Sequence, residues 1–203
     1  MVIEKTAHEL KAISDSTVDL GLNDGLLGIC LFYFQYSRYT NDRKFEMYAY
    51  DLIDKIQNSI STTTPPGYYN GLSGIGSVIT FLIHENFIDA DVNEILEDFD
   101  NVLSKFIDEN EHYDFGFQEG LIGVATYFCN RIQWNRIKLN HSIWMIIKKV
   151  LDSLESSLKI TNEASCSINP IFLFPSEVID DTVLFLNLLQ NLNYTDKSVF
   201  RIK

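Results

Sequence analysis

A short glycine motif recurs three times at nearly constant spacing, and each copy opens a stretch of residues without charge. The first glycines lie 46 and 49 residues apart in the three copies, which are Gly25-Leu-Leu-Gly28, Gly71-Leu-Ser-Gly74 and Gly120-Leu-Ile-Gly123. A period in this range is typical of folds that stack one supersecondary unit, such as solenoids and toroids. The repeat therefore constrains the fold more than any other feature of the sequence.

The stretches that follow the glycine motifs are predicted to be buried helices. Each is 11 to 13 residues long, and they are 25–36, 71–83, 120–130 and, less clearly, 182–192. A helix with almost no charge on any face must be surrounded on every side. Polar residues that precede the first three and are expected to cap them are Asn23 or Asp24, Asn70 and Glu119.

Amphipathic segments alternate with these buried ones. They are 42–60, 91–109 and 142–158, and each carries one apolar stripe at three- and four-residue steps. The alternation predicts inner and outer helix layers. The expected fold is all-α, an α/α toroid or incomplete barrel of about four helical hairpins. We expect residues 1–203 to form a single domain, and the last hairpin begins with the degenerate Val178-Ile-Asp-Asp181.

The presence of two glycines in each motif can be explained physically. Residues at i and i+3 lie on one helix face, so Gly25 with Gly28, and its two repeats, would let neighbouring backbone approach closely. Glycine in a helix costs about 1 kcal/mol relative to alanine, so its repeated use implies a need. We expect that need to be packing, with a ligand near the helix start as the alternative.

Composition excludes several functional classes. Asp and Glu outnumber Lys and Arg by 28 to 16, giving a net charge of −12, which disfavours nucleic acid and anionic membranes as partners. No uncharged apolar run reaches the ~18 residues of a membrane span, and the first residues lack the apolar core of a signal peptide. Three scattered cysteines do not form a disulfide framework. We expect a cytoplasmic protein.

The cysteines and histidines could carry chemistry, but each also has a purely structural interpretation. Cys30, Cys129 and Cys166 do not sit at metal-ligand spacing, and we expect buried thiols in the core. His84 and His112 are expected at the surface.

Acids collect near the predicted starts of inner helices, and aromatics accompany them. Two carboxylates about 5–9.5 Å apart would suit glycoside hydrolysis, whereas single carboxylates at helix starts act as caps. The acids are Asp24, Asp114, Glu119, Asp180 and Asp181. The aromatics, which could line a sugar or peptide groove or seal the end of the ring, are Tyr68, Tyr69, Tyr113, Phe115 and Phe117.

Two of the motifs, read with their flanking residues, carry a family resemblance. Tyr69-Asn-Gly-Leu-Ser-Gly-Ile-Gly76 and Asp114-Phe-Gly-Phe-Gln-Glu-Gly-Leu-Ile-Gly123 resemble the lanthionine synthetase C-like (LanC-like) family, over roughly residues 20–190. The resemblance implies a closed α/α toroid. It also implies a zinc-dependent cyclase that adds a cysteine thiol to dehydroalanine or dehydrobutyrine in a precursor peptide. In that family the zinc ligands come from a Trp-Cys-Tyr-Gly-type and a Cys-His-Gly-type motif.

This sequence contains neither zinc motif, so the resemblance transfers no metal ligand. We expect a catalytically incomplete member that acts in peptide modification as an accessory or peptide-binding module. One alternative is a carbohydrate-active toroid enzyme that uses Asp24, Glu119, Asp180 and Asp181. The other is a non-enzymatic interaction domain that pairs with a second copy or a partner chain, because a partial ring exposes apolar faces.

Overall fold

The computed structural model describes residues 2–109, 116–135, 147–150 and 152. Within these ranges the chain is helical and contains no strand, which confirms the predicted all-α class. Residues 147–150 and 152, inside the predicted helix 142–158, are helical as well. The predicted helix 182–192 and the degenerate start at 178–181 lie outside the described residues. The helices are α1 (Val2–Ser16), α2 (Leu26–Thr40), α3 (Arg43–Ser59), α4 (Leu72–His84), α5 (Val92–Glu109) and α6 (Leu121–Asn135).

Five of these helices begin within one residue of the predicted positions, and α1 was not predicted. Its charges lie on one side of the helix, but the opposite side, made of Ile3, Ala7, Leu10 and Ser14, contains a small residue, a polar residue and an exposed isoleucine, so its apolar stripe is weak. The helix α2 ends four residues later than expected. Asn41 adopts the left-handed conformation (φ 55°) there, and its N–H donates to the Ser37 carbonyl.

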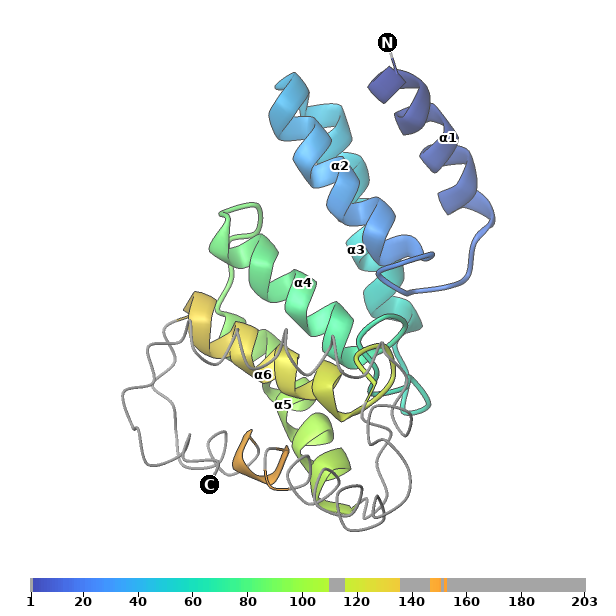
Figure 1. Ribbon diagram of the computed structural model, residues 1–203. Helices are drawn as coiled ribbons and strands as arrows, with labels where there is room; N and C mark the ends of the chain where they lie inside the picture. Colours follow the sequence, from blue (N-terminus) through green and yellow to red (C-terminus); the bar gives the residue numbers. More distant parts are fainter. Residues whose placement is uncertain (1, 110–115, 136–146, 151, 153–203) are drawn as a thin grey trace, which may run out of the picture.

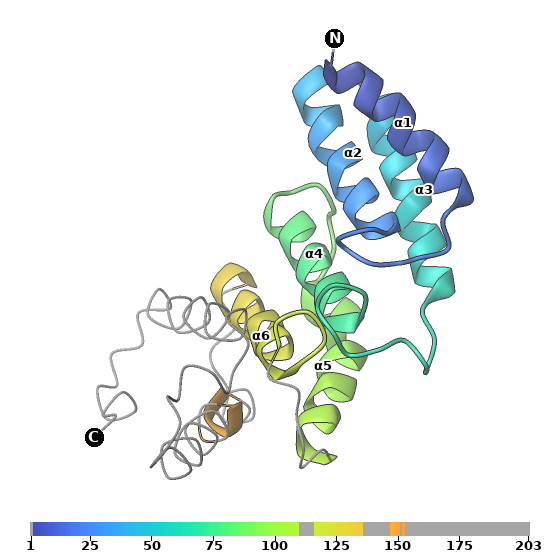
Figure 2. The same cartoon turned by 45° about the vertical axis from the view of Figure 1, so that its right-hand side comes forward.

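The helices form the predicted inner and outer layers (Figures 1 and 2). The inner helices follow one another, since α4 contacts both α2 and α6. The outer helices cover them: α3 packs against α2, and α5 packs against α4 and α6. The remaining helix, α1, lies beside α2 and α3 at one end of the array (Figure 2).

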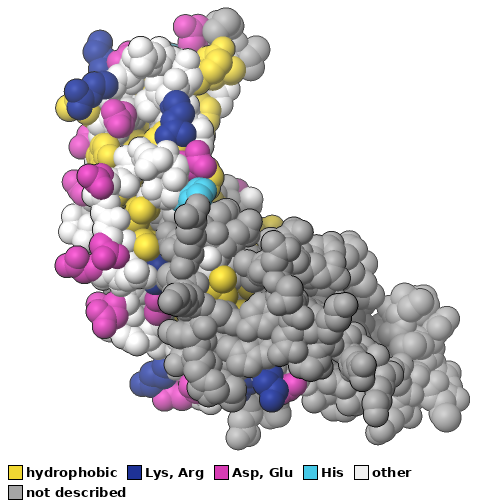
Figure 3. Space-filling view, turned by 90° about the vertical axis from the view of Figure 1, so that its left-hand side faces the viewer, with side chains coloured by type: hydrophobic (Ala, Val, Ile, Leu, Met, Phe, Trp, Pro, Cys, Tyr) yellow, Lys and Arg dark blue, Asp and Glu magenta, His cyan; other side chains and the backbone are white. Residues whose placement is uncertain are grey.

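Burial separates the two layers as their charge patterns predict. Nine of the 13 residues of α4 are buried, against four of the 18 residues of α5. An uncharged helix is stable only when neighbours surround it, whereas an amphipathic helix needs one covered stripe. Figure 3 shows acidic side chains spread down one edge of the described surface, in keeping with the net charge of −12.

The apolar core runs without a break from the first hairpin to the last described one. One cluster of buried residues joins α2, α3 and α4, and a second joins α5 and α6. Half-buried Ile79 of α4 and Phe99 of α5 pack against both clusters. A fully buried Leu, Ile or Phe side chain stabilises a fold by about 1.5–3 kcal/mol. The continuous core therefore holds consecutive hairpins together.

Candidate functional site at the inner helix starts

Backbone carbonyls, and not side chains, cap the starts of α2 and α4. The cap residues Gly25 and Gly71 are extended and make no side-chain cap hydrogen bond. The Leu26 N–H donates to the Asp19 carbonyl and the Leu72 N–H to the Pro65 carbonyl, both at 2.8 Å. The loop before each helix therefore folds back over the first turn and satisfies its free amides.

The expectation that Asn23, Asp24 or Asn70 caps these helices was wrong. The amides that such a side chain would reach are already taken by loop carbonyls seven residues upstream. Asp24 is exposed, and its carboxylate instead accepts a hydrogen bond from the Asn23 amide at 2.9 Å.

The second glycine of each motif receives the same loop. A Cβ on Gly28, Gly74 or Gly123 would overlap a backbone carbonyl six residues upstream, that of Leu22, Tyr68 or Phe117 respectively. Because a carbonyl of the main chain cannot rotate away as a side chain can, only glycine fits at these positions. These close backbone contacts are what the packing interpretation of the glycine pairs expects.

The loops of successive repeats also bind one another. The Leu22 N–H donates to the Tyr69 carbonyl, and the Tyr68 N–H donates to the Gln118 carbonyl, each at 2.6 Å. Gly67 packs against Glu119 of the following repeat, as Gly21 packs against Asn70. We call these three loops, residues 17–25, 60–71 and 116–120, the rim. The rim is thus a ladder of equivalent backbone contacts along the inner layer.

Aromatic side chains gather on the rim. The ring centroids of Tyr68 and Phe117 are 4.5 Å apart, and those of Tyr69 and Phe117 are 5.9 Å apart. The Asn130 amide nitrogen lies 3.3 Å from both the Tyr68 and Ser77 hydroxyl oxygens. Burial raises the pKa of the Tyr68 phenol, which is therefore a neutral, fixed group. The structure brings together three of the five predicted aromatics, and Tyr113 and Phe115 lie outside the described residues.

Two of the predicted acids belong to the rim. Asp24 and Glu119 are both exposed, and they stand before the starts of α2 and α6. The three rim loops contain no Lys or Arg. Asp114, Asp180 and Asp181 lie outside the described residues, so the carboxylate pair of a glycoside hydrolase stays a prediction.

The thiols described lie in the core. Cys30 is buried, and its Sγ lies 3.4 Å from the Ala49 carbonyl of α3. Cys129 is buried in α6 within the other core cluster. Burial raises the pKa of both thiols, that of Cys129 to about 12. The expectation of core thiols is confirmed for these two, and Cys166 lies outside the described residues.

These residues do not fit a zinc ion. A zinc-binding cysteine must be a thiolate, and burial in apolar surroundings disfavours that form in both described thiols. His84 is exposed at the end of α4, as predicted, and His112 lies outside the described residues. The part of the chain that the structure describes holds no group of three or more His, Cys, Asp or Glu arranged to bind a metal.

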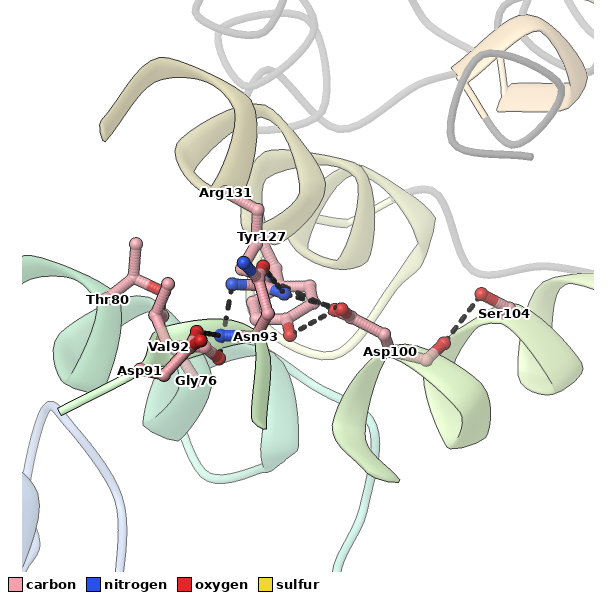
Figure 4. Close-up of polar contacts among 9 residues, drawn as sticks. All are labelled: Gly76, Thr80, Asp91, Val92, Asn93, Asp100, Ser104, Tyr127 and Arg131. Carbon is pink, nitrogen blue, oxygen red and sulfur yellow. Dashed lines mark hydrogen bonds and ion pairs between the residues drawn. The ribbon is translucent and has the colours of Figure 1, made fainter. Parts of the chain in front are cut away.

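A buried charge network that the sequence analysis missed joins α5 to α6 (Figure 4). The Arg131 side chain is only 2% exposed, and its Nη2 lies 2.7 Å from Oδ2 of Asp100. The Tyr127 hydroxyl donates to Oδ1 of the same carboxylate at 2.5 Å. Arg131 also donates to the Val92 carbonyl and to the Asn93 side chain, both at 3.4 Å.

The network is structural, because its polar groups satisfy one another. Burial and the Asp100 carboxylate both raise the pKa of Tyr127, so its hydroxyl stays a donor. One sequence signal could have revealed it: Arg131 directly follows ten consecutive uncharged residues, 121–130. A charge in that position must find a partner.

A family model matches most of the chain. The family model of the lanthionine synthetase C-like proteins matches residues 16–176, from the last residue of α1 onward. No curated protein matches the chain. No described helix is both long enough and apolar enough to cross a membrane. The matched range covers well over half of the sequence and includes all three glycine motifs with their rim, so the chain belongs to the lanthionine synthetase C-like family.

Proposed function

We propose that the chain serves lanthionine or thioether formation in peptides as an accessory, peptide-binding module and does not act as the cyclase by itself. The proposal rests on a contrast between two parts of the family's pattern in this chain. The inner helix starts and their rim are intact in three repeats, while the sequence lacks both zinc-ligand motifs.

The chemistry of the described thiols supports the accessory role. A thiol adds to a dehydroamino acid as its thiolate, and a catalytic centre for that reaction must favour the charged sulfur. Cys30 and Cys129 have the opposite environment, since burial raises the pKa of both. Neither suits the role of a metal ligand that would activate the thiol of the peptide.

We place the peptide on the rim. Tyr69 and Phe117 offer aromatic surface there, and both are half-buried and so still reachable. The exposed carboxylates Asp24 and Glu119, without a Lys or Arg in the rim loops, favour neutral or cationic peptide side chains over acidic ones. The proposal places the protein in the reducing cytoplasm.

Fluorescence anisotropy tests the binding half of the proposal. The probe is a labelled synthetic peptide with one dehydroalanine and one cysteine. We expect saturable binding that weakens about 10-fold in Tyr69→Ala, the size of effect expected when an aromatic contact is lost. Tyr39→Ala is the matched control, because Tyr39 is 68% exposed at the far end of α2. Absence of binding, or an equal loss in the control, would refute a peptide site on the rim.

A thiol count tests the catalytic half. Cyclisation adds the thiol without changing the peptide mass, so free cysteine is counted by alkylation and mass spectrometry. We expect no loss of free thiol and zinc well below one ion per chain by elemental analysis. Stoichiometric zinc together with cyclised peptide would show that the chain is a complete enzyme.

The same proposal expects a partner chain that supplies the zinc motifs. Addition of that partner should restore thiol loss in the peptide assay. Light scattering distinguishes the alternative of a self-associating interaction domain, which would give a dimer that binds no peptide. Release of reducing sugar from an oligosaccharide, abolished in Glu119→Gln, would instead favour the carbohydrate enzyme.

A further inference from the structure

The helix α1 is held to the protein in a different way from the inner helices. Among its described side chains only Ala7 and Ser14 are buried, and Ile3 and Ile13 are 41% and 48% exposed. The inner helix α4, in contrast, buries nine of its residues. Apart from Ala7 and the half-buried Leu10, which join the core cluster of α2 to α4, α1 itself buries little apolar surface when it docks.

Polar groups of α2 and α3 also hold α1. The Tyr33 hydroxyl donates to the Ala7 carbonyl at 2.5 Å, and Lys55 Nζ donates to the Ser14 carbonyl at 2.9 Å. The Ser14 and Tyr48 hydroxyls share a hydrogen bond, and the Lys11 ammonium lies 5.0 Å from the centroid of the Tyr48 ring. Water can replace such contacts when a helix moves away, so their net contribution is small.

An exposed residue separates the end of α1 from the backbone that is tied to the inner helices. Val18 is 90% exposed. From Asp19 onward the backbone is tied to the rim, because the Asp19 and Leu20 carbonyls accept from α2 and the Leu22 N–H donates to Tyr69. A rotation at Thr17 and Val18 would thus move α1 without breaking any of these rim contacts.

The family match begins at the last residue of α1. We propose that α1 is a strap that opens as a unit on a hinge at Thr17 and Val18, while the rim from Asp19 onward and the inner helices stay folded. In its closed position it covers the edge-to-face ring pair of Tyr33 and Tyr48, whose centroids are 4.7 Å apart. Its opening controls access to that aromatic surface. This inference does not depend on the proposed peptide chemistry.

Hydrogen exchange of the full chain, followed by mass spectrometry, tests the strap. We expect the amides of α1 to exchange at least 10-fold faster than those of α4. Tyr33→Phe should speed exchange in α1 by about 3- to 10-fold and leave α4 unchanged, since one hydrogen bond is removed from the closed state alone.

Tyr50→Phe is the matched control. The Tyr50 hydroxyl also donates to a backbone carbonyl at 2.5 Å, but that carbonyl belongs to Phe87, after α4. This variant should leave exchange in α1 unchanged. The strap is disproved if α1 exchanges at the rate of α4, or if Tyr33→Phe accelerates α1 and α4 equally.

Thiol trapping gives a second readout of access. In Ala7→Cys, the thiol introduced at position 7 lies under the strap, and the native Cys30 in the core is the internal reference. We expect alkylation at position 7 at least about 10-fold faster than at Cys30, and faster still when Tyr33→Phe is added. Equal rates at the two positions would show that α1 opens only when the whole protein unfolds.

Discussion

The α2–α3 and α5–α6 contacts join an inner to an outer helix by different means. Between α2 and α3 the contact is aromatic and close: the Tyr33 and Tyr48 rings lie 4.7 Å apart, and Phe34 and Tyr50 lie 5.2 Å apart. Between α5 and α6 a buried guanidinium meets a half-buried carboxylate. The repeated glycine motif therefore fixes how each inner helix begins. It does not fix which kinds of side chain join an inner helix to an outer one.

The two kinds of contact should fail differently. Shortening a side chain at the aromatic contact should lower the free energy of unfolding in proportion to the surface and volume removed. A buried ion pair depends on both partners, because removing one leaves the other charged and without water. The predictions below test this difference, from the largest expected effect to the smallest.

Asp100→Leu should have the largest effect, about 3–5 kcal/mol of unfolding free energy, because Arg131 would stay buried without its carboxylate. Urea unfolding followed by circular dichroism measures it. Glu85→Leu is the control, since Glu85 and Arg38 form an exposed pair at 3.3 Å and should lose about 1 kcal/mol or less. Adding Arg131→Met to Asp100→Leu should recover most of the loss. If it does not, the charge is not what makes this contact fragile.

Gly74→Ala should cost about 2–3 kcal/mol, because its Cβ would overlap the fixed Tyr68 carbonyl. Gly76→Ala in the same helix would meet the buried ring of Tyr127, which can yield a little where a main-chain carbonyl cannot, and should cost about 1–2 kcal/mol. Thermal unfolding of the two variants compares their losses of stability. The reverse order would contradict the role assigned to the rim carbonyls.

Phe34→Leu at the aromatic contact should cost about 1–2 kcal/mol, with a gradual loss as the side chain is shortened further. Urea unfolding of Phe34→Leu and Phe34→Ala measures the gradient. A loss in Phe34→Leu as large as that in Asp100→Leu would remove the distinction between the two contacts.

The smallest effect concerns pH. Burial, and then the nearby Tyr48, Asp15 and Tyr36, raise the pKa of Tyr33 to about 12. The ordinary value near 10 applies in the unfolded chain, so this group stabilises the fold fully below pH 10 and loses that contribution as pH rises toward 12. Unfolding of Tyr33→Phe should therefore depend less steeply on pH across this window. Because Tyr68 and Tyr127 titrate as well, only the difference between the two proteins is informative.

The fold could be predicted to the extent that local pattern decides it. Charge-free segments identified α2, α4 and α6, and apolar stripes identified α3 and α5. The helix α1 has only a weak stripe, because its buried positions are the small Ala7 and the polar Ser14, whose partners Tyr33 and Tyr48 lie on other helices. The capping of α2 and α4 was mispredicted for a related reason: the acceptors are backbone carbonyls, which every residue carries and no sequence pattern reveals.

Of the candidate site, the rim glycines and three aromatics were foreseen, since they follow from the repeat. Arg131 was not, because a single charge after an apolar run resembles a helix end. Its partner Asp100 lies 31 residues away on another helix, and only the fold brings the two together.

The ladder of loop contacts along the rim limits where this chain can change length. The carbonyl that faces each second glycine comes six residues upstream in all three repeats, although the repeats are 46 and 49 residues long. The difference of three residues must therefore be absorbed away from the rim. Inserted sequence should be tolerated at the opposite ends of the inner helices, near Asn41 and Asn86, which both already adopt positive φ. The rim loops set the register of the array, and one added residue there would shift every later contact.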